Sequence, residues 1–234
     1  MAGLLVGVDA TAHPAQFSPK IIEAFQKYID EFVIPFTPHP KVLDPFAGVG
    51  NIHRLVGCDT YGIELEPAWA TQHPRTLVGD ATALPFGDNS FDVAITSPCY
   101  ANRMSDHHNA KDGSYRRTYT HHMRALLNDD TVKLHERNAG QMQWGEGYRK
   151  LHEEAWAEVY RVLKPNSYFL LNVKDHQRKH AKVSVSAWHA NVCRDLGFRL
   201  MHIQRIETRH FRYGANRRRF PERVLVFLKL RWYL

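Results

Sequence analysis

The feature that most limits the fold of this chain is an alternation of short apolar runs with loops and amphipathic stretches, which begins at Lys41. Such an alternation is typical of parallel strands joined by crossover connections. The runs that we expect to form strands are residues 41–44, 60–64, 76–79, 91–96 and 168–173. The sequence therefore predicts an α/β protein with a mostly parallel sheet.

Two helices are expected in the second half of the chain. Residues 148–162 place apolar side chains at helical spacing on one face, and the Lys-Pro-Asn segment at 164–166 ends that helix. Residues 183–196 form a second amphipathic stretch, and Gly197 just beyond it is suited to a helix C-terminus.

The last two apolar runs, residues 201–206 and 223–230, leave no room for a crossover helix between them and predict an antiparallel pair. With 234 residues, 44% of them hydrophobic, the chain has enough apolar material for one core, so we expect a single domain. Its parts are an N-terminal arm and helix (residues 1–40), a first half of the sheet (41–100), a long polar insertion without a sustained period (101–147) and a second half of the sheet (148–234). The second half contains a basic hairpin loop at 208–221. An insertion of that kind is either a functional loop or a disordered one.

Composition and charge disfavour several classes of protein. Only three cysteines occur, without a paired short spacing, so neither a disulfide framework nor a cysteine zinc site is expected. The histidine pairs at 107–108 and 121–122 do not predict a metal site, because adjacent side chains rarely point the same way. No apolar run approaches the roughly 20 residues of a membrane span, so we expect a soluble cytoplasmic protein. The formal net charge of +7 favours polyanions such as nucleic acid.

Three features that suit a nucleoside follow three successive strands. Asp44 ends the first strand, and the small residues of the turn at 47–50 let a ligand approach the backbone closely. Glu64, at the tip of the second strand, is positioned to accept hydrogen bonds from both hydroxyls of a ribose. Asp80 follows the third strand and can face an adenine amino group. His53 breaks the Gly-x-Gly-x-x-Gly pattern of dinucleotide enzymes, so nicotinamide binding is disfavoured.

The fourth strand continues into Ser97-Pro98-Cys99-Tyr100, at the same edge of the sheet. Together with Asp44-Pro45-Phe46-Ala47-Gly48-Val49-Gly50, this tetrapeptide resembles the paired signatures of the amino-group DNA methyltransferases, which modify cytosine N4 or adenine N6. In that family the tetrapeptide is commonly Ser-Pro-Pro-Tyr in the cytosine branch and Asp-Pro-Pro-Tyr or Asn-Pro-Pro-Tyr in the adenine branch. Ser97 therefore favours cytosine N4. The departure from the pattern is Cys99, which replaces a proline that stiffens the turn.

The resemblance implies a Rossmann-like methyltransferase fold with seven strands and S-adenosyl-L-methionine as the cofactor. Phe17-Ser18-Pro19-Lys20 looks like the N-terminal motif that packs against the methionine end of that cofactor. Residues 80–96 and 156–173 are typical of class I methyltransferases generally. The cofactor-binding residues that the resemblance implies are Phe17, Ser18, Pro19, Asp44, Pro45, Phe46, Ala47, Gly48, Gly50, Asn51, Glu64, Leu65, Asp80, Ala81 and Ser97.

The tetrapeptide also suggests how the acceptor is activated. An aromatic amino group is a poor nucleophile, because it shares its lone pair with the ring. The resemblance implies that Ser97 Oγ and the Pro98 carbonyl accept its N–H groups and align the nitrogen. It also implies that Tyr100 stacks on a base that has flipped out of the duplex. Attack by Cys99, as in cytosine-C5 enzymes, is disfavoured because methylation of an amino group needs no covalent nucleophile.

Two basic segments are candidates for contact with nucleic acid. The loop at 208–221 interleaves arginines with aromatic residues, which suits phosphate contacts, although a solvated hairpin loop would have the same composition. Its candidate residues are Arg209, Arg212, Arg217, Arg218 and Arg219. The insertion follows the fourth strand directly, and side chains that could read base edges there are Asn102, Arg103, Arg116, Arg117, Gln141 and Gln143.

The sequence thus predicts an enzyme that methylates the exocyclic amino group of a flipped base in double-stranded DNA, with cytosine N4 favoured. It would be of a bacterial or viral type, the modification arm of a restriction system with an endonuclease partner. Three alternatives stay open: adenine N6 methylation, an RNA or small-molecule methyltransferase on the same fold, and an inactive relative that binds DNA. No metal is expected, since methyl transfer from a sulfonium needs none.

Overall fold

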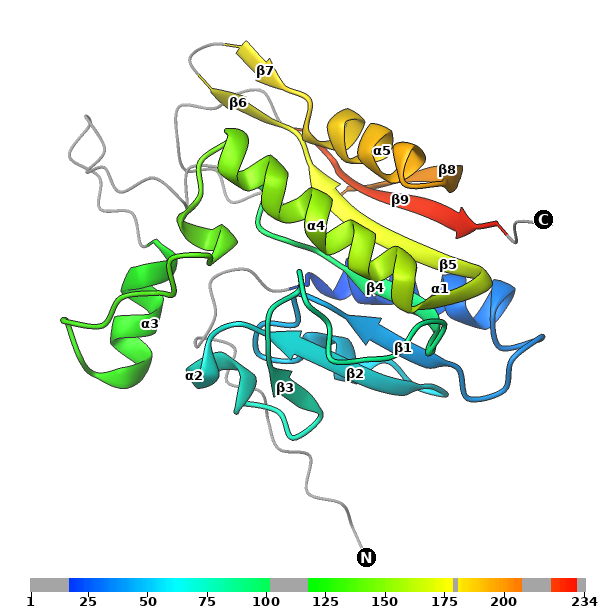
Figure 1. Cartoon of the computed structure of the whole chain (residues 1–234), viewed down its shortest axis with the longest axis horizontal. Coiled ribbons are helices and arrows are strands. Elements are labelled where there is room, and N and C mark those ends of the chain that lie inside the picture. The colour runs from blue at the N-terminus through cyan, green and yellow to red at the C-terminus, as the bar shows by residue number, and fades with distance from the viewer. Residues whose placement is uncertain (1–16, 102–117, 179–180, 208–219, 231–234) are drawn as a thin grey trace, which may run out of the picture.

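The frame of the protein is one seven-stranded sheet (Figure 1), seen in a computed structural model that describes residues 17–101, 118–178, 181–207 and 220–230. The spatial order of the strands is β3-β2-β1-β4-β5-β9-β8. The first five of these run parallel, and β9 runs antiparallel to β5 and to β8. The strands are β1 (Lys41–Asp44), β2 (Asp59–Glu64), β3 (Thr76–Val78), β4 (Phe91–Thr96), β5 (Leu163–Lys174), β8 (Phe198–Ile206) and β9 (Glu222–Lys229). The predicted fold class is confirmed, including its antiparallel terminal pair.

Helices cover both faces of this sheet, α4 and α5 on one face and α1 on the other (Figure 1). The period of two along a strand divides the core, because it sends Phe169 and Leu171 to the side of α4 while Leu170 packs on the side of α1. The helices are α1 (Pro19–Phe32), α2 (Pro67–Ala70), α3 (Tyr119–Leu127), α4 (Glu146–Val162) and α5 (Val185–Asp195), with short 3-10 turns at η1 (Asn51–Arg54) and η3 (Ala139–Gln141). None of the helices in the described ranges is long and apolar enough to cross a membrane.

The helix expected at 148–162 is α4, and it ends at Val162 as the Lys-Pro-Asn segment predicts. The next strand begins at once, five residues earlier than expected. Its first residues pair with β4 through an irregular register, in which Phe91 lies opposite Leu163 and Val93 opposite Tyr168. Proline is tolerated at such an irregular strand start, because the lost N–H is not part of a regular ladder.

The expectation of an irregular insertion is wrong for part of residues 101–147, which contain α3 and η3. A capping box between Thr118 and His121 starts α3, and Tyr119 and Met123, four residues apart, are its buried positions. Two buried side chains are too few to create a sustained period in the sequence. A two-stranded hairpin of β6 (His176–Arg178) and β7 (Ala181–Val183), which the sequence pattern did not predict, precedes α5.

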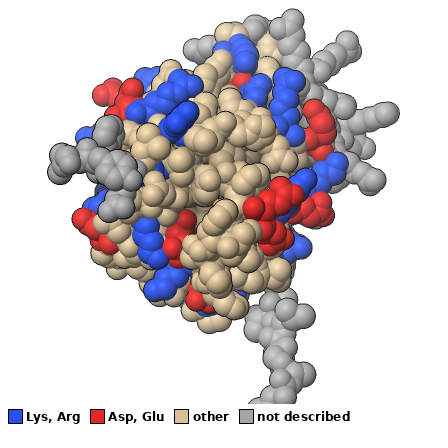
Figure 2. Space-filling view, turned by 90° about the vertical axis from the view of Figure 1, so that its right-hand side faces the viewer, with Lys and Arg blue, Asp and Glu red and all other residues tan. Residues whose placement is uncertain are grey.

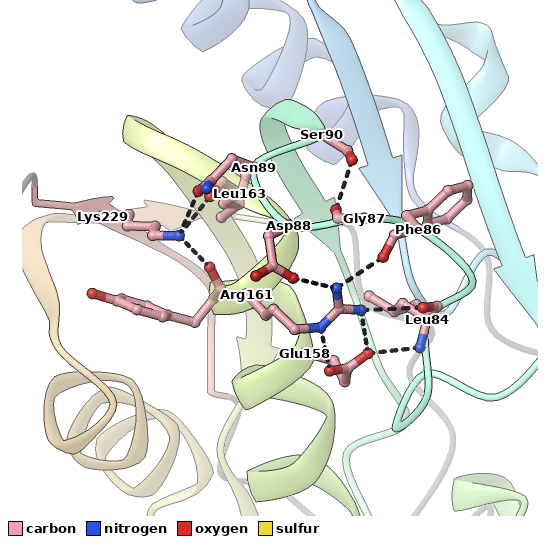
Figure 3. A network of polar contacts seen from close by, with 11 residues as sticks. Leu84, Phe86, Gly87, Asp88, Asn89, Ser90, Glu158, Arg161, Leu163 and Lys229 are labelled. Atoms are coloured by element: carbon pink, nitrogen blue, oxygen red, sulfur yellow. Dashed lines mark hydrogen bonds and ion pairs between the residues drawn. The ribbon is translucent and has the colours of Figure 1, made fainter.

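Arg161 ties the loop before β4 to helix α4 (Figure 3). Its guanidinium forms a two-point ion pair with Glu158 and donates to the carbonyls of Leu84 and Phe86 and to the Asp88 carboxylate. Fixing this loop sets where β4 starts, and β4 delivers the site residues at its other end.

Candidate active site

A pocket opens at the carboxyl ends of β1, β2 and β4, with about 760 Å³ of empty space when its open mouth is included. Parallel α/β sheets bind ligands at this edge, at the point where the strand order reverses. Here that point lies between β1 and β4, because the chain proceeds from β1 to β3 in one direction and from β4 to β5 in the other. Eleven of the fifteen residues predicted to bind the cofactor line it: Phe17, Pro45, Phe46, Ala47, Gly48, Asn51, Glu64, Leu65, Asp80, Ala81 and Ser97. Ser18, Pro19, Asp44 and Gly50 are not part of the lining.

Asp44 stabilises the turn that follows β1. Its side chain is fully buried, and Oδ1 accepts a hydrogen bond from the Phe46 amide at 3.0 Å. Among the described residues, none donates a hydrogen bond of good geometry to Oδ2. Burial raises the pKa of Asp44 to about 7, although the neighbouring Thr96 hydroxyl and the Phe46 amide oppose this shift.

Glu64 lies at the end of β2 with both carboxylate oxygens already in use. Oε2 accepts from the Gly48 amide and Oε1 from the Glu66 amide, each at 2.9 Å. The carboxylate thereby fixes the turn after β1 against the end of β2, and it retains lone pairs for a ligand because each oxygen has two. Burial raises the pKa of Glu64 to about 7, and the two backbone hydrogen bonds offset part of that shift.

His53 has a structural role at the position where a dinucleotide fold would carry glycine. Its ring is hydrogen-bonded to the hydroxyls of Thr60 and Thr76, at 2.8 and 2.9 Å, and it stacks on His73. Gly50 adopts a φ of +83°, and a Cβ added there would come within 2.7 Å of the His73 Cβ. The pair of histidines therefore requires glycine at position 50, which explains that residue although it does not line the pocket.

The insertion forms one wall of the pocket, through residues that the sequence analysis did not single out. Arg137 pairs with the Asp80 carboxylate at 3.2 Å and also reaches Thr82 and Glu154. Asn138 donates to Glu66 at 2.7 Å, and the same oxygen of Glu66 accepts from the His135 amide. Further lining residues that sequence reasoning missed are Trp69, Gly79, Cys99, Tyr119, Ala139 and Leu151. The sequence contains no local pattern that indicates these contacts, because the paired side chains lie far apart along the chain.

The four residues of the tetrapeptide do not all face the same way. Ser97, Pro98 and Cys99 line the pocket, and among the described residues no donor reaches the Pro98 carbonyl. Tyr100 is not part of the lining. Its hydroxyl lies 2.7 Å from Ser97 Oγ and donates to Glu222 at 3.1 Å. Stacking of this ring on a base would require the side chain to leave those partners.

The Cys99 thiol is a poor nucleophile in this environment. Burial raises the pKa of its thiol to about 12, so the thiol is protonated at neutral pH. Because the thiolate is the nucleophilic form, covalent attack by Cys99 is disfavoured here. The backbone of the same residue is fixed, since the Tyr148 hydroxyl donates to its carbonyl at 2.8 Å.

All eight residues predicted to bind nucleic acid, Arg103, Arg116, Arg117, Arg209, Arg212, Arg217, Arg218 and Arg219, lie outside the described residues, as does Asn102. Gln141 and Gln143 are described. The Gln141 amide donates to the carbonyls of Leu134 and His135, and the Gln143 side chain accepts from Arg178, so both are engaged within the protein.

Comparison with known proteins agrees with this geometry. Residues 41–116 match a family model described as a methyltransferase domain. No curated protein matches the chain in sequence. Among solved structures, an S-adenosylmethionine-dependent methyltransferase from Methanosarcina mazei is 15% identical, with 92% of this chain and 99% of that chain covered and a TM-score of 0.54. The [4+2]-cyclase SpnF is 14% identical over 93% and 84% of the two chains, with a TM-score of 0.56.

A third structure, 1,6-didemethyltoxoflavin-N1-methyltransferase from Burkholderia thailandensis with bound S-adenosylhomocysteine, is 15% identical over 95% of this chain and 80% of that chain, with a TM-score of 0.50. At these identities the structures establish the fold. The family model covers residues 41–116, about a third of the chain, and together with the fold and the pocket it indicates the class of S-adenosylmethionine-dependent methyltransferases.

Proposed function

We propose that this methyltransferase modifies the exocyclic amino group of a DNA base that has flipped out of the duplex, with cytosine N4 as the favoured target. One observation carries the proposal. Ser97 and Pro98, the residues that carry the two acceptors of the tetrapeptide, line the same pocket as Glu64 and Asp80. An amino group that donates to both acceptors would therefore lie next to the bound cofactor.

The residues of the pocket suit S-adenosylmethionine. Glu64 retains acceptor capacity for two ribose hydroxyls, and Asp80 and Ala81 lie where an adenine amino group would approach. The residues nearest the methionine end would be Phe17 and the turn at 47–51. When bound, the cofactor supplies an electrophilic methyl group.

The chain's own contribution to the reaction is orientation and desolvation. Two acceptors on adjacent residues fix the amino nitrogen in position, and fixed geometry of this kind supplies much of the rate in a bimolecular transfer. The buried walls of the pocket exclude water, which strengthens the hydrogen bonds to Ser97 and Pro98. No acid, metal or covalent nucleophile is required of the protein.

Contact with DNA has a weaker basis in the described part of the chain. On the face shown in Figure 2, Lys and Arg side chains lie among Asp and Glu side chains and do not form one continuous basic patch. The net charge of +7 supports a polyanionic substrate in general. We assign the phosphate contacts to the basic loop at 208–221, and we place the protein as the modification arm of a restriction system.

The decisive experiment is incubation of the full chain with methyl-labelled S-adenosylmethionine and mixed genomic DNA, followed by identification of the modified nucleoside. We expect N4-methylcytosine. N6-methyladenine would transfer the assignment to the adenine branch. If label enters RNA added in parallel and never enters DNA, the proposal is wrong. A Ser97→Ala variant serves as the control, because it keeps the fold and removes one acceptor.

A further inference from the structure

Ser97 belongs to a group of five polar side chains, and the proposed chemistry has used none of the other four. The group is here called the Glu222 cluster: Ser97, Tyr100, Asn172, Lys174 and Glu222. Asn172 and Glu222 are buried, and the other three are partly buried. The Tyr100 hydroxyl lies 2.7 Å from Ser97 Oγ, 2.8 Å from Asn172 Nδ2 and 3.1 Å from Glu222 Oε2. Lys174 pairs with the other oxygen of Glu222 at 3.2 Å. The cluster thus joins the pocket to the start of β9.

The directions of these hydrogen bonds follow from the groups involved. A carboxylate only accepts, so the Tyr100 hydroxyl hydrogen points to Glu222. The hydroxyl oxygen of Tyr100 must then accept, which makes Ser97 the donor in the contact between them. Asn172 is held with its amide nitrogen toward Glu222 and also donates to Ser97 Oγ at 3.1 Å. One lone pair of Ser97 Oγ remains for an N–H group from the pocket.

We propose that Ser97 and Tyr100 form a proton relay that carries the proton released by the methyl acceptor to Glu222. The inference rests on the proposed function, because it takes an N–H group as the acceptor. As the new N–C bond forms and the C–S bond breaks, the N–H proton passes to Ser97 Oγ. The Ser97 proton passes to the Tyr100 oxygen, and the Tyr100 proton passes to Glu222 Oε2. Glu222, which is paired with Lys174, then releases this proton to water.

Two properties of Tyr100 suit this role. Burial and the nearby charge of Glu222 hold its pKa well above the usual value, so the hydroxyl keeps its proton between turnovers. The ring lies outside the pocket lining and packs against the core on the side of α4, which leaves the hydroxyl as its functional group. Glu222 is a positioning group and proton acceptor, since it acts on the substrate only through Tyr100 and Ser97.

The test compares Glu222→Gln and Tyr100→Phe with the wild type in single-turnover methylation. Both substitutions keep the size of the side chain and interrupt the relay. We expect each to lower the rate roughly 100-fold, the usual scale for lost proton transfer. The double variant should be no slower than the slower single variant, because both changes break one chain. The KM for DNA, the affinity for S-adenosylhomocysteine and the melting temperature should stay near the wild-type values.

The matched control is Glu207→Gln, which removes an exposed carboxylate at the end of the neighbouring strand β8 and should leave the rate unchanged. If Tyr100→Phe keeps the full rate while Tyr100→Ala loses it, the ring and not the hydroxyl is required, and the relay is refuted. Additive losses in the double variant would refute it as well.

A second measurement separates failure of the relay from failure of the proposed function. If the wild type methylates RNA or another acceptor in place of DNA, the proposed function fails, and the same variants assayed on that acceptor still test the relay. Independently of any acceptor, tyrosine labelled with ¹³C at Cζ should show a changed Tyr100 resonance in Glu222→Gln. A resonance identical to that of the wild type would overturn the proposal, because it would mean that the two groups are not hydrogen-bonded.

Discussion

The hydroxyl of Tyr148 donates a hydrogen bond of 2.8 Å to the carbonyl oxygen of Cys99, and so fastens helix α4 to the turn after β4. The same hydroxyl lies 3.2 Å from His189 Nε2 of α5, whose other ring nitrogen accepts from Trp156. The family pattern would stiffen this turn with a second proline at position 99. Here a partly buried hydrogen bond from a helix far along the chain restrains the same residue.

Tyr148→Phe should therefore loosen the turn that carries Ser97 and Pro98. We expect methyl transfer to slow about threefold to tenfold, and the free energy of unfolding to fall by about 1–3 kcal/mol, because the Cys99 carbonyl loses a buried partner. The measurements are single-turnover kinetics and chemical denaturation. Tyr61→Phe is the matched control, since the Tyr61 ring packs on Phe86 and Phe91 away from the turn. Equal rates in the two variants would show that the hydrogen bond does not position the turn.

From the raised pKa of Glu64 we predict how the affinity for the cofactor depends on pH. Its pKa is raised to about 7 by burial, so below that pH the ligand-free protein holds the carboxyl protonated. Ribose hydroxyls that donate to the site favour the charged form, so binding should release a proton and weaken by up to about tenfold per pH unit as pH falls below 7. Titration calorimetry with S-adenosylhomocysteine from pH 5.5 to 8.5 measures this.

In Glu64→Gln the affinity should fall at pH 8 by roughly 10-fold to 100-fold, on the scale of two lost hydrogen bonds to a charged group, and most of the pH dependence should disappear. Asp44 titrates in the same range but does not line the pocket, so Asp44→Asn should retain the dependence. A wild-type affinity that is flat from pH 5.5 to 8.5 would exclude this role for Glu64.

Arg137 joins the insertion to the pocket through its ion pair with Asp80. Both side chains are partly exposed, so Arg137→Ala should change the free energy of unfolding by less than about 1 kcal/mol. The affinity for S-adenosylhomocysteine should nevertheless fall about threefold to tenfold, because the wall formed by residues 137–139 loses its ion pair with Asp80, which follows β3. Arg194→Ala, on the exposed side of α5, provides the control for removal of a cation. If the two variants bind S-adenosylhomocysteine equally well, the insertion does not support the pocket.

The arginines of the basic loop should make DNA binding depend on salt concentration. Neutralising Arg217, Arg218 and Arg219 should weaken binding of a DNA duplex and reduce the slope of log K against log salt by about 2 to 3, as expected for three lost phosphate contacts. Fluorescence anisotropy at several salt concentrations measures the slope. A variant with the exposed Lys27, Lys150 and Arg194 neutralised carries the same change of net charge. Equal slopes in the two variants would indicate that only the overall charge acts on DNA.

Local sequence patterns are sufficient to predict the frame of this protein and one side of its pocket. Apolar runs of period two, the glycines of the turn after Asp44 and the acids that follow successive strands are local signals, because each depends on neighbours within a few residues. Once the strands are parallel, their carboxyl ends must meet at one edge. Glu64, Asp80 and Ser97 can therefore be assigned to one pocket from the sequence.

The residues that close the pocket, and the directions of the tetrapeptide side chains, depend on tertiary packing. The pairs Arg137 with Asp80, Asn138 with Glu66 and Tyr100 with Glu222 join residues 57, 72 and 122 positions apart. Contacts over such separations depend on how the helices and strands pack, and no local period records them. The hydroxyl of Tyr100 is the clearest case, since the sequence assigned its ring to a flipped base and the folded chain directs that hydroxyl toward a carboxylate on the last strand.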